Sequence, residues 1–145
     1  METDILIRKV IIKDSEEIAN LSSQLGYPAT LDDMQNRLQE IIRHSWNCAF
    51  AAVENEKVIG WIHAFYITRV ETAPFVEIAG LVIDENYRGK HTGRKLVAAV
   101  KDWCLSKGVT TLRVRSNALR YDAHEFYKHI GFTEIKSQKV FDLSL

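Results

Sequence analysis

The apolar positions of the chain follow two periods, one typical of strands and one typical of helices. Residues 5–13 are rich in β-branched side chains and predict a strand. Asp14 and Glu17 have the spacing of a capping box, so we expect a helix over residues 14–25. After the break at residues 26–28, Thr30 can cap a second helix whose apolar residues recur at helical spacing: Leu31, Met34, Leu38, Ile41 and Ile42. The first third therefore reads as strand, helix, turn and helix.

Extended apolar runs dominate the middle of the chain. Residues 48–54 and 58–67 predict two strands, and the short polar segment between them predicts a hairpin, with Gly60 marking a bulge. Residues 75–84 predict a further strand, followed by a polar, glycine-containing segment. An amphipathic helix then ends near Gly108.

The last third alternates strand and helix again. Residues 110–116 alternate like a strand, residues 119–129 suit a helix stopped by Gly131, and two short extended stretches close the chain. This order predicts an α/β (α+β) fold with a mixed sheet and helices packed on it. With 145 residues and 46% hydrophobic content, the sequence predicts one domain over residues 1–145.

The charge balance limits the partners that we expect. Nineteen basic residues offset nineteen acidic ones, so no long-range positive field attracts nucleic acid or a membrane surface. The N-terminus lacks the apolar region of a signal peptide, and no apolar run approaches the roughly 20 residues that span a bilayer. We therefore expect a cytoplasmic protein with neither nucleic acid nor membrane as a partner.

The cysteines and histidines give no metal-ligand pattern. Cys48 and Cys104 form no CxxC spacing, and His124 and His129 lie five residues apart, which places them on different helix faces. Neither cysteine has a neighbouring base or a helix-start position that would activate it as a nucleophile. We expect no metal, and two reduced, buried thiols.

A basic, glycine-containing turn is the sharpest chemical feature of the sequence. It lies between a predicted strand and the start of a predicted helix, where free backbone N–H groups and the helix dipole favour bound phosphate. Neither the Walker pattern GxxxxGK[ST] nor the dinucleotide pattern GxGxxG is present. Its candidate phosphate-binding residues are Arg88, Gly89, Lys90, His91, Thr92, Gly93 and Arg94.

This turn resembles the acyl-CoA pyrophosphate loop of the GNAT superfamily of N-acetyltransferases. Arg88 and Gly93 match the loop's pattern, whereas His91 stands where the first glycine of that pattern usually lies. Either the backbone at this position has a less glycine-like conformation, or His91 tolerates a positive φ at modest cost. Residues 75–135 carry the resemblance, because residues 77–90 are similar to the family's fourth strand and loop and residues 123–132 to its late helix.

The resemblance implies a fold and a cosubstrate. The fold is a mixed, mostly antiparallel sheet of about seven strands, splayed between strands 4 and 5, with about four helices on both faces. The cosubstrate is acetyl-CoA, whose pantetheine arm would pair with Leu81, Val82 and Ile83 of the fourth strand. Asn117 resembles the asparagine that contacts this arm, although an isolated loop asparagine also serves as a turn residue.

Transfer of an acetyl group to an amine needs a base for the amine and an acid for the leaving thiolate. Glu77 interrupts an apolar strand and resembles the family's acidic base; the alternative is a carboxylate that simply faces solvent. Tyr127 matches the family's tyrosine near the thioester sulfur; the alternative is an aromatic anchor of its helix. We expect direct attack by the amine in a ternary complex.

Aromatic residues are the candidates for binding the acceptor. Trp61, His63 and Phe65 alternate on one face of a strand and would line a pocket beside Glu77, although core packing is the commoner role for aromatic residues. Tyr27 and Trp46, in the loops that flank the second helix, could close over the acceptor.

Three functions remain open on this sequence. The first is acetyl-CoA-dependent N-acetylation of a primary amine on a small molecule. The second is N-acetylation of a protein or peptide, which needs an open groove. The third is a non-catalytic acyl-CoA-binding sensor, because fold alone does not establish function. A homodimer is a further expectation, because residues 139–145 could pair with a second chain at a sheet edge or fold back as a hairpin strand.

Overall fold

The computed structural model describes residues 4–89 and 91–145, which divide after Val114 into two compact units. The first unit contains a single sheet of five strands in chain order: β1 (Leu6–Lys9), β2 (Asn47–Glu54), β3 (Lys57–Ile67), β4 (Phe75–Ile83) and β5 (Leu112–Val114). Neighbouring strands are antiparallel, except that β4 and β5 are parallel. The mixed, mostly antiparallel sheet is therefore confirmed.

The expected number of about seven strands is wrong. The missing strands were expected in the closing stretches, yet no residue of 133–145 is assigned to a strand or helix. Side chains there remain open to solvent, and Val140 and Phe141 are 84% and 86% exposed. An alternating apolar pattern forms a strand only where a partner strand is available, and none of the described residues 133–145 belongs to the sheet.

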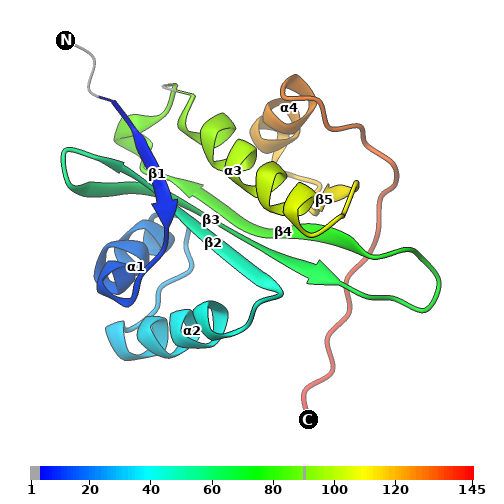
Figure 1. The fold of residues 1–145 in the computed structure, drawn as a ribbon, viewed down its shortest axis with the longest axis horizontal. Helices are drawn as coiled ribbons and strands as arrows, with labels where there is room; N and C mark the ends of the chain where they lie inside the picture. The colour runs from blue at the N-terminus through cyan, green and yellow to red at the C-terminus, as the bar shows by residue number, and fades with distance from the viewer. Residues whose placement is uncertain (1–3, 90) are drawn as a thin grey trace. The chain divides into compact units, whose positions relative to one another are not determined.

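Helices cover both faces of the sheet in the first unit, as predicted. Helices α1 (Ser15–Gln24) and α2 (Leu31–Arg43) lie on one face and α3 (Thr92–Ser106) lies on the other (Figure 1). The α1–α2 side encloses a core whose buried members come from both helices and the sheet: Val10, Ile18, Ala19, Leu21, Met34, Leu38, Ala51, Val58 and Val82. Leu96, Val97 and Val100 of α3 are fully buried against the other face.

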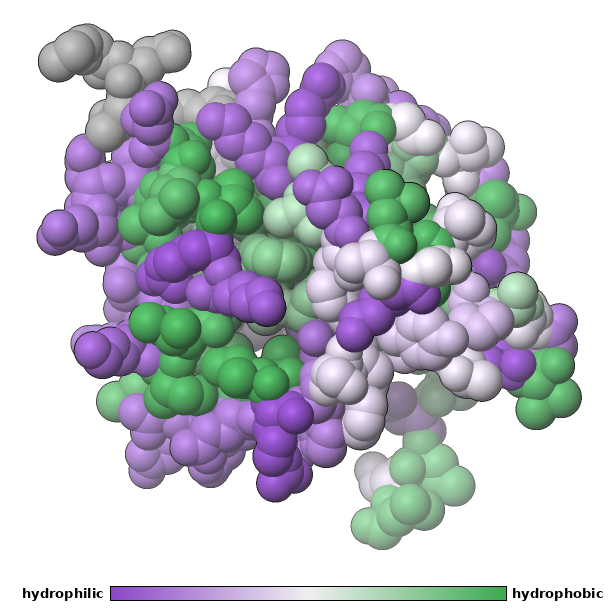
Figure 2. Space-filling model, viewed as in Figure 1, coloured by the Kyte–Doolittle hydropathy of each residue, from purple (hydrophilic) through white to green (hydrophobic). Residues whose placement is uncertain are grey.

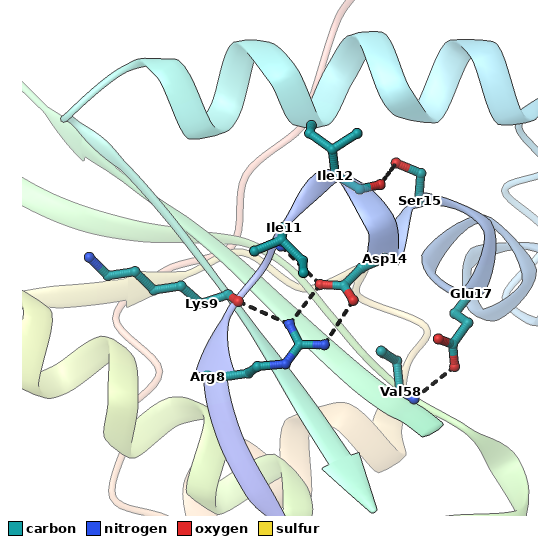
Figure 3. A network of polar contacts seen from close by, with 8 residues as sticks. All are labelled: Arg8, Lys9, Ile11, Ile12, Asp14, Ser15, Glu17 and Val58. Carbon is teal, nitrogen blue, oxygen red and sulfur yellow. Dashed lines mark hydrogen bonds and ion pairs between the residues drawn. The ribbon is translucent and has the colours of Figure 1, made fainter. Parts of the chain in front are cut away.

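The start of α1 is fixed differently from the predicted capping box. Asp14 accepts two hydrogen bonds of 2.8 Å from the Arg8 guanidinium of β1 and one of 2.9 Å from the backbone N–H of Ile11, while Glu17 accepts from the N–H of Val58 (Figure 3). The capping-box prediction is wrong, because Asp14 makes no side-chain cap bond and instead binds the partly exposed guanidinium of Arg8, while Glu17 binds a backbone N–H of β3. The two acids tie α1 to the sheet.

Turn chemistry in the first unit follows the sequence closely. Thr30 caps α2 through a 3.0 Å bond that Oγ1 accepts from the N–H of Asp33. Asn55 and Glu56 both have positive φ, so the hairpin between β2 and β3 uses a two-residue turn of the kind that matches strand twist. The register shifts beside Gly60, which faces Ala52, so the predicted bulge is present next to this glycine.

The second unit contains one helix, α4 (Tyr121–His129), followed by Gly131 at φ 110°. Two short 3₁₀ helices, Ile12–Asp14 and Glu85–Tyr87, lie in the first unit. Hydrophobic residues appear in separate patches on the face drawn in Figure 2, interrupted by hydrophilic ones. No helix of the described residues is long and apolar enough to cross a bilayer.

Candidate active site

The parallel pairing of β4 with β5 is short, and it leaves part of β4 open. Paired positions run only from Val76 to Ile78 on β4 and from Leu112 to Val114 on β5. Beyond them, Leu81, Val82 and Ile83 pair with β3 on one side and have no partner in β5 on the other. Peptide N–H and C=O groups on an open strand edge can pair with a ligand that carries amides.

A β-bulge lies at the start of this opening. His63 faces Gly80 and Ala64 faces Ile78, so Ala79 is the extra residue, and it is exposed. A Cβ built on Gly80 would come within 2.8 Å of the Trp61 ring, so the indole needs glycine at this position. Bulges bend a strand and redirect its side chains, and they are frequent beside active sites.

The polar turn after β4 leads into α3 with two residues in the left-handed region. Gly89 has φ 84°, and His91, the residue that precedes α3, has φ 60° and ψ 18°. The expected tolerance of a positive φ at His91 is confirmed. Arg88 and Arg94 are exposed, and Lys90 lies outside the described residues.

The first turn of α3 supplies hydrogen-bond donors. The N–H of Lys95 bonds to the carbonyl of His91, so the N–H groups of Thr92, Gly93 and Arg94 precede the helical ladder. Thr92 is 2% exposed, and its hydroxyl has no hydrogen-bond partner among the described residues. A buried, unpaired hydroxyl beside three such N–H groups fits a bound phosphate oxygen.

Glu77 lies on β4 two residues before the bulged Ala79, and it is 9% exposed. Its register partners are Phe65 on β3 and Arg113 on β5. Side chains at paired positions share a face of the sheet, so Glu77 lies on the same face as Phe65 and, two residues before it, His63. The solvent-facing alternative for Glu77 is therefore wrong, because this carboxylate is buried.

His63 has a defined hydrogen bond. Its Nε2 lies 2.9 Å from Oδ1 of Asn47 on β2. Because Oδ1 only accepts, the proton sits on Nε2, and Nδ1 of the neutral ring is left as an acceptor. Burial lowers the pKa of this imidazole, which favours the neutral form. The sequence predicted His63 beside Glu77 but gave no sign of Asn47, because the residues of one strand do not show which residues of the neighbouring strand lie opposite them.

Aromatic side chains near this face differ in exposure. Trp61 packs against the core on the α1–α2 side, and its indole nitrogen is buried with no partner among the described residues. Trp46 is half-exposed and stacks on His44 at 4.3 Å between ring centroids. Tyr27, in the loop after α1, is 71% exposed. The structure therefore brings His63 and Trp61 to the face of Glu77 and leaves Tyr27 at the surface.

Two predicted site residues belong to the second unit. Tyr127 on α4 packs edge-to-face on Phe126 and Phe132, with centroids 5.2 and 5.5 Å apart. Burial raises the pKa of its phenol, against the opposing effect of Arg120, so the hydroxyl is protonated at neutral pH. Asn117 accepts a bond of 2.9 Å from the N–H of Leu119, which is the turn role weighed for it.

The cysteines are poor nucleophiles in this fold. Burial raises the pKa of Cys48 to about 12 and raises that of Cys104 as well. A thiol at such a pKa carries almost no thiolate at neutral pH. Among the described residues, no group of three or more His, Cys, Asp or Glu side chains is placed to hold a metal ion.

Residues 15–132 match the Acetyltransferase (GNAT) family. The chain belongs to this family. The resemblance to the GNAT superfamily is thereby confirmed, and the open stretch of β4 and the first turn of α3 lie within the matched residues.

Individual relatives of this GNAT chain differ in what their names describe. N-acetylaspartate synthetase of Xenopus tropicalis is 26% identical over 71% of the chain, which spans only 37% of that protein. Aminoglycoside N(6')-acetyltransferase type 1 of Stenotrophomonas maltophilia is 24% identical over 96% of the chain and 93% of that protein. Aminoglycoside N-acetyltransferase AAC(6')-Iy, solved in complex with CoA, superposes with a TM-score of 0.88 at 19% identity over 100% of the chain and 98% of its own. This last likeness supports the fold.

Proposed function

We propose that the chain transfers an acetyl group from acetyl-CoA to a primary amine of a small molecule by direct attack. The observation that carries the proposal is the open edge of β4 beside the first turn of α3, where the buried hydroxyl of Thr92 has no partner among the described residues. An extended amide-containing arm suits the edge, and a pyrophosphate suits the helix start. The membership of the GNAT family and a CoA-bound neighbour in the same fold support this choice.

The proposed cosubstrate contacts divide between the strand and the turn. Leu81, Val82 and Ile83 would offer backbone groups to the pantetheine amides. The turn would hold the pyrophosphate through backbone N–H groups and positive side chains, which are contributed by Arg88, Gly89, Lys90, His91, Thr92, Gly93 and Arg94. Asn117 would contact the pantetheine arm by donating from its Nδ2, because its Oδ1 already accepts a hydrogen bond from the N–H of Leu119.

Glu77 is the proposed base, acting directly or through a water molecule. A primary amine is mostly protonated at neutral pH, so it must lose one proton before its lone pair attacks the thioester carbonyl carbon. As the C–N bond forms, the C–S bond breaks, the attacking nitrogen releases its second proton to solvent, and the departing thiolate takes a proton. Tyr127 is the proposed acid for this proton, since its phenol stays protonated at neutral pH. Trp61, His63 and Tyr27 are the proposed acceptor-binding residues.

Calorimetric titration with acetyl-CoA tests the first half of the proposal. Arg88→Ala removes a charge from the turn, and Gly93→Asp places a carboxylate in the first turn of α3, so both should weaken binding strongly. Arg37→Ala, which removes an exposed arginine of α2, is the matched control and should bind like the wild type. No binding by folded wild-type protein would refute the proposal.

Release of the coenzyme thiol in the presence of a panel of amines tests the second half. Turnover with small amines supports the proposal, turnover with peptides alone would instead favour a protein N-acetyltransferase, and tight binding with no turnover would favour a sensor. The names of the relatives include an N-acetylated amino acid and an aminoglycoside, so they leave the acceptor open. A cytoplasmic location, a homodimer and a single domain over residues 1–145 remain part of the proposal.

A further inference from the structure

Two arginines stack on one buried aromatic ring at the end of the sheet face that carries Glu77. The guanidinium carbon of Arg113, on β5, lies 4.3 Å from the centroid of the Phe75 ring, and that of Arg69, just after β3, lies 5.3 Å from the same centroid. Phe75 is 2% exposed. The two positive charges are therefore closer together than roughly one Debye length, about 10 Å at 0.1 M salt.

These arginines lie on the face of the sheet that carries Glu77, the proposed base. Phe75 and Glu77 are two residues apart on β4, so their side chains point to the same face. Arg113 is the register partner of Glu77 on the neighbouring strand. The ring and its two guanidinium groups lie on the side of Glu77 away from the bulge and the α3 turn, which is the side left for the acceptor once the cosubstrate arm occupies the open edge.

Stacking on a ring leaves the binding edge of a guanidinium unused. The N–H donors of arginine lie in the plane of the group, so a cation–π contact still allows a bidentate bond to an anion. Arg69 has an ion pair with Glu71 at 3.8 Å, but Glu71 is 68% exposed and the pair is screened. The Arg113 side chain contacts Phe75, and within residues 4–89 and 91–145 this side chain has no hydrogen bond or ion pair.

We propose that the acceptor amine carries an anionic group, a carboxylate or a phosphate, that Arg69 and Arg113 bind beside the Phe75 ring. This inference rests on the proposed function and names its substrate class. The acceptor would be zwitterionic, with its ammonium group at Glu77 and its anion at the arginines. Successive side chains on one strand face are about 7 Å apart, a span that a small amino acid bridges with help from the long arginine side chains. Polycationic aminoglycosides would be repelled by the same pair.

Matched pairs of acceptors test the proposal. Thiol release is followed with tyrosine and tyramine, arginine and agmatine, and lysine and cadaverine, in which only the carboxylate differs. Phosphoethanolamine and ethanolamine form the phosphate arm, and an aminoglycoside is the polycationic comparison. We expect the anionic member of at least one pair to have the higher kcat/KM. A higher kcat/KM for the anion-free member of every pair would overturn the proposal.

Variants of the arginines separate recognition from structure. Arg113→Gln and Arg69→Gln should lower kcat/KM for the anionic member by about ten- to a hundred-fold, mostly through KM, and leave its anion-free partner within about three-fold. Arg113→Lys keeps a positive charge over the ring but loses the bidentate geometry of the guanidinium, so its kcat/KM for the anionic member should lie between those of the wild type and Arg113→Gln. Arg37→Gln is the control. Equal losses for both members of a pair would show a structural role and overturn the proposal.

The inference and the proposed function can fail separately. The proposed acetyl-CoA contacts do not include these arginines. If the wild-type protein does not bind acetyl-CoA, the proposed function is refuted and the arginine site is not. If no amine turns over, the anionic members are titrated into the CoA-saturated protein while the Arg113 Nε–H resonance is followed by NMR. A shift with an anionic member and not with its partner supports the site, and no shift with any anionic member overturns it.

Discussion

Replacement of Thr92 by valine should have opposite effects on the free and the ligand-bound protein. The Thr92 hydroxyl is buried at the first turn of α3 and has no partner among the described residues. A buried hydroxyl without a partner costs about 1–3 kcal/mol, and valine fills the same volume without it. The variant should therefore raise the free energy of unfolding of the free protein by about 1–2 kcal/mol.

Bound acetyl-CoA reverses this expectation. If the hydroxyl donates to a phosphate oxygen, valine removes a hydrogen bond to a charged group, which is worth about 1.5–3 kcal/mol. The dissociation constant of acetyl-CoA should then rise by about ten- to a hundred-fold. Thr92→Ser, which keeps the hydroxyl and loses a methyl group, should bind like the wild type.

Two measurements on the same variants check both halves. Thermal unfolding without ligand should show a midpoint about 2–8 °C higher for Thr92→Val. Calorimetric titration with acetyl-CoA should show the weaker binding. Thr110→Val, at an exposed position before β5, is the control and should change neither quantity. A free Thr92→Val protein that is less stable than the wild type would refute the reasoning, because the hydroxyl would then have a partner in the fold.

Three further predictions address the sheet, the α1 junction and the thiol. Gly80→Ala places a Cβ 2.8 Å from the packed Trp61 ring and should destabilise the fold by about 1–3 kcal/mol in urea unfolding; an unchanged midpoint would contradict the crowding argument. Burial raises the pKa of Asp14, but its hydrogen bonds from Arg8 and Ile11 lower it more, so the folded pKa lies below the ordinary value of an aspartate. Asp14→Asn should therefore cost about 2 kcal/mol at pH 7, and the difference from wild type should shrink as pH falls below about 4. A pH-independent difference would count against this account. Cys48→Ala should retain acetyl transfer, since a thiol of pKa about 12 is no nucleophile at neutral pH; abolished turnover in the folded variant would point to a covalent route.

Local signals in the sequence were sufficient for most elements. The cap at Thr30, the turn at Asn55 and Glu56, and the helix-to-loop changes at Gly108 and Gly131 each depend on neighbouring residues alone, and the structure has them all. The prediction of strands in residues 133–145 was wrong for the opposite reason. A strand needs a partner, and whether a distant edge is available is not encoded in the alternation of a short segment.

The candidate site was predictable where it depends on a contiguous segment and unpredictable where strands meet. The α3 turn, including the left-handed His91, follows from residues that are adjacent in sequence. The bond from His63 to Asn47 joins β3 to β2, and the stack of Arg113 on Phe75 joins β5 to β4. Such pairs are set by register, which one strand cannot specify. Asp14 was likewise predicted as a cap because Arg8 was read only as part of a strand.

The short pairing of β4 with β5 has a consequence for the behaviour of the protein without ligand. A strand with open peptide groups is a template for other chains, and proteins usually protect such edges with charges, bulges or a cover. Here the bulge at Ala79 lies at the start of the open stretch, and only Ala79–Ile83 of β4 follow the β5 pairing. A ligand arm that fills this edge would act as the missing strand. Storage with CoA should therefore suppress self-association during purification, and ligand-free protein should be the form that aggregates.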